Sequence, residues 1–370
     1  MTSRERLMLA LNGEKPDRLP CTTMDMMKYW LNEEMGGVSL IEASRTLGLD
    51  ATVFAPNPPY WPYDPTFSNE TWKIDTETWN DGLGSNVRFT FTTPKGVLNM
   101  TQTTNAHTTW CTENLVKQDD DIRLLKYRPI RPFDKKKFAE LYDEVGDGGI
   151  VRTGGYGFQE GPWQDACEMH GTEEMIYAAH DKPEWVHEFL HILLDHKLKF
   201  YEMSLKDLKC DLILNGGGAG SGTVISPALH EEFCLPYDKQ LHAAIKNLSN
   251  LKVIYHICGG VTKIAHLIAQ NGCDIYESLA PLSCGGDIES DADMAGIKKA
   301  FGGKVALMGG FDQLQLLRCG SPEQIRQEVR RLFNGFGQDG GYVLMGSDHF
   351  YHAPKENLLA YVEAAKGCIY

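Results

Sequence analysis

The two residues best suited to metal chemistry are His256 and Cys258, which stand two positions apart in the segment LKVIYHICGG. The segment begins as an apolar, β-branched run that is typical of a buried strand. Alternate side chains of a strand lie on the same face, so the imidazole and the thiol can both reach one ion from the strand's end. The pair is therefore a candidate metal site. The alternative is a hydrogen-bonded core histidine beside a small buried cysteine.

Further polar side chains stand where other apolar runs end. Parallel strands bring their carboxyl ends to one edge of a sheet or barrel, so these side chains are expected to gather there. A histidine, a thiol and carboxylates from adjacent strands can make a tetrahedral zinc site with one open position. The alternatives are that Glu277 pairs with a lysine and that Asp312 or Asp348 caps a helix. The residues at these ends are Tyr156, Asn215, Glu277, Asp312, Ser347, Asp348 and His349, with His352 soon after.

A second metal motif, H-E-x-x-H, occurs at His187, Glu188 and His191. In a zinc peptidase the two histidines would bind the metal and Glu188 would be the general base. Here the histidines continue into a polar stripe at helical spacing with Asp195 and Lys199, as on a solvated helix surface. The motif also falls between two predicted strands, on the outside of the expected fold, so we predict that it binds no metal.

Strands and helices alternate along the chain, which predicts a parallel sheet, and eight strands favour a closed (β/α)₈ barrel. The alternative is a doubly wound fold, whose dinucleotide fingerprint should follow the first strand. The glycine-rich stretch 216–222 comes too late and fits no G-x-G-x-x-G frame. The expected strands are 20–25, 51–56, 149–156, 210–215, 251–257, 273–279, 304–309 and 341–346. The clearest expected helices are 183–206, 227–247, 261–271, 291–301, 321–335 and 354–366.

Residues 57–127 interrupt this alternation. They are rich in aromatic residues and threonine, and two stretches read as antiparallel strands joined by glycine-containing turns. We expect one barrel domain over residues 1–370, with 57–127 inserted as a lid or pocket wall. Their aromatic residues either line a ligand site or form the small core that an inserted sheet needs. These residues are Trp61, Tyr63, Trp72, Trp79, Phe89, Phe91 and Trp110.

Composition narrows the class of protein. The chain has 370 residues and a formal net charge of −14, and its longest basic run is Lys135 to Lys137, so nucleic acid is not an expected partner. Ten cysteines without a C-x-x-C pair suit a reducing compartment. No apolar run has the length of a membrane span, and the first residues lack a signal-peptide pattern. A soluble cytoplasmic protein is expected.

Five segments together resemble the uroporphyrinogen decarboxylase superfamily over essentially the whole chain. They are TSRERLMLALNGEKPDRLP, ISPALHEEFCLPYDKQL, HICGG, VALMGGFD and PKENLLAYVEAA. The resemblance implies a single (β/α)₈ barrel and one of two activities. One is cofactor-free decarboxylation of a tetrapyrrole, and the other is zinc-dependent methyl transfer to or from a corrinoid protein.

The first-strand loop separates these activities. Decarboxylases of the superfamily carry an arginine-bearing P-R-Q-A-G-R loop there, whereas this chain has Cys21 to Met27 without arginine. The resemblance to the corrinoid-linked methyltransferases implies that His256 and Cys258 are zinc ligands. Their second cysteine, at the end of strand eight, is replaced by the stretch Gly346 to His349. Glu277, Asp348 or His349 would then complete the site.

A zinc ion with one thiolate and carboxylates is harder than one with two thiolates, and it is a stronger Lewis acid. The resemblance therefore favours an O-demethylase methyltransferase that takes a methyl group from a small methoxylated donor, with methoxylated aromatics as one candidate class. Zn²⁺ is the expected metal, and the corrinoid (cobalamin) is carried by a partner protein. His349 is the predicted catalytic acid, and Tyr156, Asn215, Asp312 and His352 are predicted to bind the donor. A homodimer is a possible assembly. The alternatives are a decarboxylase-type lyase and a non-catalytic binding barrel.

Overall fold

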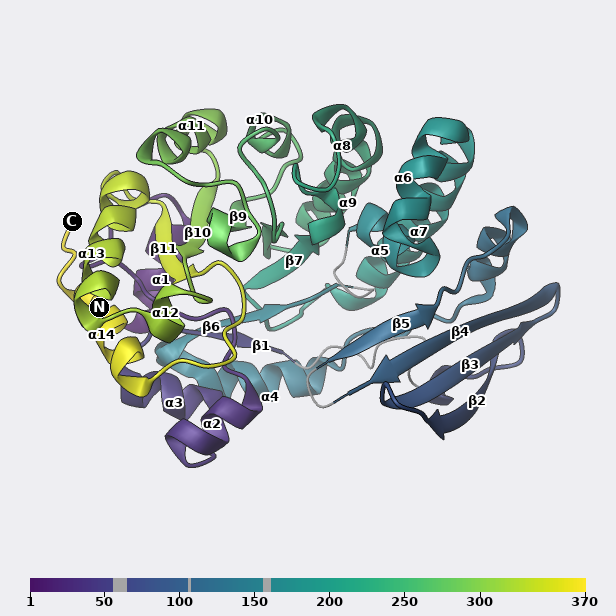
Figure 1. Ribbon diagram of the computed structural model, residues 1–370, viewed down its shortest axis with the longest axis horizontal. Helices are drawn as coiled ribbons and strands as arrows, with labels where there is room; N and C mark the ends of the chain where they lie inside the picture. The colour runs from purple at the N-terminus through teal and green to yellow at the C-terminus, as the bar shows by residue number, and fades with distance from the viewer. Residues whose placement is uncertain (56–64, 106–107, 156–160) are drawn as a thin grey trace.

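The computed structural model describes residues 1–55, 65–105, 108–155 and 161–370, and a seven-stranded parallel sheet lies at its centre (Figure 1). Consecutive strands of this sheet are neighbours in space, in the order β1-β6-β7-β8-β9-β10-β11. Together with the helices between them, they give the α/β architecture that the sequence predicted. The strands are β1 (Ala51–Phe54), β6 (Gly149–Thr153), β7 (Leu212–Gly216), β8 (Lys252–His256), β9 (Ile275–Ser278), β10 (Ala306–Phe311) and β11 (Tyr342–Gly346).

The predicted first strand, 20–25, is wrong. Cys21 makes one isolated bridge, to Leu344 of β11, and Thr22 N–H donates to the same residue's carbonyl. Pro20 has no N–H to donate, and the Cys21 N–H donates to the Asp50 carboxylate at 3.1 Å instead of to a strand. The segment nevertheless lies between the two edges of the sheet, because Asp50, just before β1, donates its N–H to the Cys21 carbonyl.

The inside of the curved sheet is filled by alternate residues of its strands. Side chains from six strands form an apolar cluster that is separate from the larger outer core. Helix α1 (Ser3–Leu11) adds Leu7, Ala10 and Leu11 to this cluster and so covers the amino ends of the strands. The carboxyl ends are left to carry polar groups. The strand residues in the cluster are Ile150, Leu212, Leu214, Ile254, Ile275, Ala306, Met308, Val343 and Met345.

Helices surround the sheet on its outer side (Figure 1). Ser226 and Ser321 cap α8 and α13 with their side chains, as expected of a serine before a first-turn proline. None of the described helices is long and apolar enough to cross a membrane. The remaining helices are α2 (Lys28–Met35), α3 (Leu40–Leu47), α4 (Lys135–Val145), α5 (Pro162–His170), α6 (Thr172–Asp181), α7 (Pro183–Ser204), α8 (Pro227–Phe233), α9 (Leu235–Leu248), α10 (Ala265–Ile268), α11 (Asp291–Phe301), α12 (Leu316–Cys319), α13 (Pro322–Leu332) and α14 (Lys355–Lys366).

The predicted insertion contains a four-stranded antiparallel sheet, which lies beside the parallel sheet (Figure 1). Its core is aromatic: Trp72 and Phe91 are fully buried with ring centroids 5.0 Å apart, and Phe89 is buried beside them. These three residues therefore stabilise the inserted sheet. Trp61 and Tyr63 fall outside the described residues. The strands are β2 (Lys73–Asn80), β3 (Ser85–Thr93), β4 (Gly96–Thr104) and β5 (Thr109–Glu113).

Candidate metal centre

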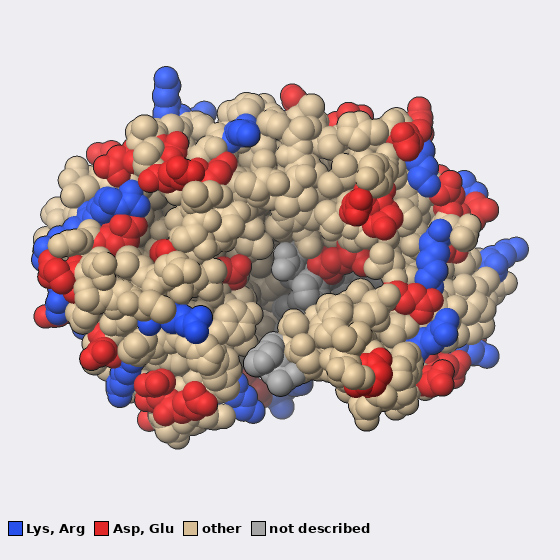
Figure 2. Space-filling view, in the orientation of Figure 1, with Lys and Arg blue, Asp and Glu red and all other residues tan. Residues whose placement is uncertain are grey.

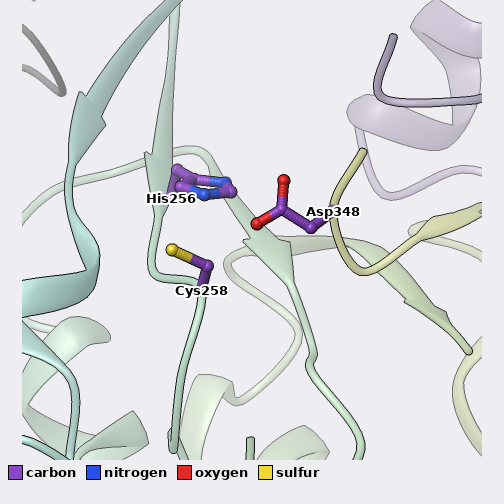
Figure 3. A group of neighbouring side chains, drawn as sticks. All are labelled: His256, Cys258 and Asp348. Carbon is purple, nitrogen blue, oxygen red and sulfur yellow. The ribbon is translucent and has the colours of Figure 1, made fainter. Parts of the chain in front are cut away.

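Three potential metal ligands meet at the carboxyl ends of the strands. His256 ends β8, Cys258 follows two residues later, and Asp348 follows β11, and each offers a ligand atom within 4.8 Å of the other two. Figure 3 shows the Asp348 carboxylate pointing across from the β11 loop toward the other two side chains. Ligands of tetrahedral zinc at bond lengths of about 2.0–2.3 Å stand about 3.3–3.8 Å apart. A contraction on the order of 1 Å therefore brings these atoms to zinc-binding distance, and the imidazole, thiolate and carboxylate donors suit Zn²⁺.

Glu277 lies next to this cluster and bonds to one of its members. Its Oε2 is 3.1 Å from His256 Nδ1, and the two residues face each other across the paired strands β8 and β9. Arg152 of β6 donates to both carboxylate oxygens, at 2.5 and 2.6 Å. Glu277, predicted as a metal ligand, is thus held between a guanidinium and the ring of His256.

The position of these three residues follows from the alternation of side chains along each strand. Each stands two residues after an inward-facing isoleucine, so Arg152, His256 and Glu277 also face the inside of the sheet. His256 pairs in register with Gly216 of β7, which has no side chain. Room is therefore left above the apolar interior for the large polar groups.

The charges of this group support one another. Burial by itself would raise the pKa of Glu277, but the charges of Arg152 and His256 and their hydrogen bonds to the carboxylate together lower it to about 2. Burial lowers the pKa of His256, but the hydrogen bonds to Cys258 and Glu277 outweigh it and raise the pKa. Glu277 is therefore ionised, and a metal ion that binds His256 displaces a proton from the ring.

His349 lies directly beside Asp348. Its backbone N–H donates to Asp348 Oδ1 at 2.7 Å, and its Nε2 is 3.7 Å from the same oxygen. Its Nδ1 is buried and has no hydrogen-bond partner among the residues that the structure describes. The predicted catalytic histidine is thus placed next to the cluster with one ring nitrogen available.

Two residues near the candidate centre, Arg152 and Asp25, were not predicted from the sequence. Burial raises the pKa of Asp25, and the Met26 N–H, His349 and Arg152 lower it, so its carboxyl lies near the candidate centre. Arg152 could have been recognised from the sequence, because it is a charged residue inside a predicted buried strand. Asp25 follows the misassigned first strand, where no strand end marked it.

Glycine-rich residues form the wall next to Cys258. A Cβ built on Gly218 would lie 3.0 Å from Cys258 Sγ, a distance at which one of the two groups must move. Gln164 of α5 holds this turn by accepting the Ala219 N–H at 2.8 Å. The stretch 216–222 therefore gives the backbone a close approach to the cluster.

The residues predicted to bind a donor are more scattered. Asn215 points to the outer side of β7, where its amide contacts Asp238 at 3.1 Å and His242 at 2.8 Å, so we leave it out of the proposed donor site. Asp312 accepts the N–H groups of Leu314 and Gln315 in the turn that precedes α12, whose N-cap residue is Gln315.

The other two predicted donor-binding residues are His352 and Tyr156. His352 is exposed, and its ring centroid lies 5.3 Å from that of Tyr29. Tyr156 falls outside the described residues. Of the four predicted donor-binding residues, none is placed against the metal ligands by the described part of the chain.

The H-E-x-x-H residues lie on α7, where His187 and Glu188 contact other side chains. His187 Nδ1 lies 2.6 Å from the Tyr237 hydroxyl, and Glu188 accepts a hydrogen bond from Arg123 at 3.0 Å. The three-residue cluster at the strand ends is the group of metal-competent side chains found among the described residues. This arrangement agrees with the prediction that the motif is part of a helix surface.

Comparisons with known proteins relate the whole arrangement to one family. A family model described as uroporphyrinogen decarboxylase (URO-D) matches residues 126–368. A solved structure, a methyltransferase from Methanosarcina mazei, aligns over 99% of both chains with a TM-score of 0.65 and 18% identity. At this identity the likeness shows the fold, an α/β fold of the same kind.

Curated relatives divide between two activities. The chain is 24% identical over 214 residues to a methylated-thiol–coenzyme M methyltransferase of Methanosarcina mazei, which covers 55% of this chain and 51% of the relative. It is 25% identical over 257 residues to a uroporphyrinogen decarboxylase of Crocosphaera subtropica, which covers 68% of this chain and 67% of the relative. The matches thus span about half to two thirds of these relatives.

Proposed function

This chain belongs to the uroporphyrinogen decarboxylase family, and we propose that it is a zinc-dependent methyltransferase that acts with a corrinoid protein. It takes the methyl group of a small methoxylated compound, with methoxylated aromatics as the first class to test. The acceptor is the cobalt of a corrinoid carried by the partner. The product that leaves is the demethylated alcohol or phenol.

The observation that carries this proposal is the cluster of His256, Cys258 and Asp348 at the carboxyl ends of the strands. Three protein ligands leave one of four tetrahedral positions open, as catalytic zinc sites do. Zn²⁺ bound there supplies Lewis acidity, which makes an ether oxygen a better leaving group. The alternative of a non-catalytic binding barrel gives no reason for such a cluster.

The donor set favours oxygen over sulfur as the atom that carries the methyl group. One thiolate with a nitrogen and a carboxylate oxygen makes a harder ion than two thiolates do. Asp348 occupies the place at the end of β11 where a second cysteine would make the site softer. Because one relative is named for methylated thiols, thiols and thioethers are the competing donor class.

His349 is proposed as the proton donor. When the methyl group leaves, the electron pair of its bond to oxygen stays on that oxygen, which then takes a proton. The Nδ1 atom of His349 is buried and unpartnered among the described residues, and its Nε2 lies 3.7 Å from Asp348 Oδ1, which supports a role for this ring as the proton donor. Asp25 lies nearby and orients the donor by accepting a hydrogen bond.

A partner protein needs a surface around the site on which to dock. Large apolar side chains are exposed in four of the loops that follow parallel strands: Val224, Leu282, Leu314 and Tyr351. Figure 2 shows a face that is hollowed near its centre, with a broad uncharged surface above the hollow and acidic side chains on its rim. We propose that the corrinoid protein binds over the carboxyl ends of the strands through these loops.

The decarboxylase alternative needs cations to bind the carboxylates of a tetrapyrrole. Arg152 is the arginine nearest the cluster that the contacts identify, and Glu277 already engages its guanidinium at both nitrogens. The segment Cys21 to Met27 adds an aspartate and no arginine. The charges of the site therefore favour methyl transfer.

The proposal is tested in two steps. Elemental analysis of the purified protein should find about one zinc per chain, lost on treatment with a strong chelator. Methoxylated aromatics, methylamines and methylthiols are then each incubated with reduced corrinoid protein while methyl–cobalt formation is followed by absorbance. Turnover confined to thiols or thioethers would refute the oxygen-donor proposal. Absence of metal together with absence of methyl transfer would return weight to the lyase.

A further inference from the structure

We propose that Glu277, clamped by Arg152, is a positioning residue that fixes the ring of His256 for metal binding and is not itself a metal ligand. This inference rests on the proposed function, because it concerns the same metal centre. It assigns a role to Arg152, which carries no part of the methyl-transfer proposal.

The contacts form a continuous chain from β6 to β8. Arg152 Nη1 and Nη2 donate to Glu277 Oε1 and Oε2 at 2.5 and 2.6 Å, and Oε2 in turn lies 3.1 Å from His256 Nδ1. The side chains of Arg152 and Glu277 are completely buried, and that of His256 is 6% exposed. The ring of Phe54, on β1, covers the Arg152 guanidinium, whose Cζ lies 4.4 Å from the ring centroid.

These contacts decide which ring nitrogen of His256 faces a metal. An ionised carboxylate only accepts hydrogen bonds, so Nδ1 carries the proton that it donates to Glu277. When a metal ion displaces the second ring proton, Nε2, the nitrogen that Glu277 does not contact, supplies the lone pair that binds it. Metal-binding histidines are commonly held in this way by a carboxylate on the second nitrogen, which fixes the tautomer and the ring orientation.

The same contacts keep Glu277 out of the metal's coordination sphere. Oε2 is bonded on the Nδ1 side of the ring, away from an ion on Nε2, and Oε1 is held by Arg152. A turn of the carboxylate toward the metal would leave the guanidinium buried without its partner, which is strongly unfavourable. The fourth position of the metal therefore stays free for the donor.

The test compares Glu277→Gln with the intact protein by two readouts that do not depend on turnover. Zinc affinity is measured by competition with a chelator, and the ligand atoms are counted by X-ray absorption at the zinc edge. We expect affinity to fall by about 10- to 100-fold while the numbers of sulfur and nitrogen or oxygen ligands stay the same. Loss of one oxygen ligand in Glu277→Gln would overturn the inference, and so would an unchanged affinity.

Asp165→Asn is the matched control. Asp165 forms another buried ion pair, 2.7 Å from Lys197, between two helices outside the sheet. The Asp165→Asn substitution should lower the stability of the protein without changing its zinc affinity. If Glu277→Gln fails to fold, Arg152→Lys replaces it, because lysine keeps the charge but cannot bond both oxygens in the plane of the carboxylate. Arg152→Lys should weaken zinc binding while the number of zinc ligands stays the same. An unchanged zinc affinity or the loss of an oxygen ligand would overturn the inference.

The intact protein separates this inference from the function on which it rests. If it binds zinc and loses it on His256→Ala, the metal centre stands, and the Glu277 variants alone decide the positioning role. If it binds no zinc, both proposals fail together.

Discussion

Replacing Arg152 by methionine should destabilise the protein by about 3–5 kcal/mol, which is the usual cost of removing one partner from a buried ion pair. The structure places this pair at the upper end of that range. Both side chains are fully buried, two short hydrogen bonds join them, and Glu277 would keep a charge that only His256 still contacts. The double variant Arg152→Met with Glu277→Leu should recover most of the loss, because well-packed apolar residues can replace such a pair at little cost.

Urea unfolding followed by circular dichroism measures these differences, and the coupling of the pair comes from the double-mutant cycle. Arg326→Met is the control, since Arg326 makes an exposed pair with Glu363 at 3.2 Å and should lose less than about 1 kcal/mol. If Arg152→Met lost no more than the control, the pair would not be the buried, closely coupled unit described above. A double variant as unstable as Arg152→Met would also refute the reasoning.

Three further predictions concern the metal centre and its surroundings. Asp348→Cys should keep zinc and shift donor preference toward sulfur, as measured with the donor panel; Ser347 is the wrong position for this change because its hydroxyl donates to Gln313. His187→Ala combined with His191→Ala should leave the zinc content unchanged by elemental analysis, and a loss of metal would move the site to α7. Leu282→Asp should weaken binding of the corrinoid protein by roughly tenfold or more in calorimetry while zinc content stays constant, because it puts a charge into an apolar docking surface.

Local patterns accounted for the parallel strands and for two of the three clustered candidate ligands. Apolar, β-branched runs of strand length have few alternatives once helical segments separate them, and seven of the eight predicted strands are present. The segment 20–25 has a similar composition, but Pro20 has no N–H and the Asp50 side chain accepts the Cys21 N–H, so the segment pairs with β11 through one bridge at Cys21 instead of forming a strand. The hydrogen bond from the Cys21 N–H to the Asp50 side chain joins residues that are far apart in the sequence, so the residues around Cys21 do not reveal it.

His256 and Cys258 were predictable as neighbours because they lie on one strand end, where a spacing of two fixes their side. Asp348 was one of several candidates for a further ligand, since Glu277 and His349 were equally compatible with the order of the strands. The structure distinguishes these three candidates. The Glu277 carboxylate is hydrogen-bonded to Arg152, whereas the Asp348 carboxylate points into the cluster with His256 and Cys258. Distance along the sequence carries no information on which loop reaches across the end of a barrel.

The sequence by itself therefore determined the α/β class, the strand ends at which polar groups collect, and the His-x-Cys pair. Only the tertiary structure decided the direction in which each strand residue points. A parallel strand is buried on both faces, so a run such as the one that ends in Asn215 is apolar throughout, and its alternation does not say which face is the barrel interior. Packing of α1 and the outer helices against opposite faces settles this, sending Asn215 outward to α9 and Arg152 inward to Glu277.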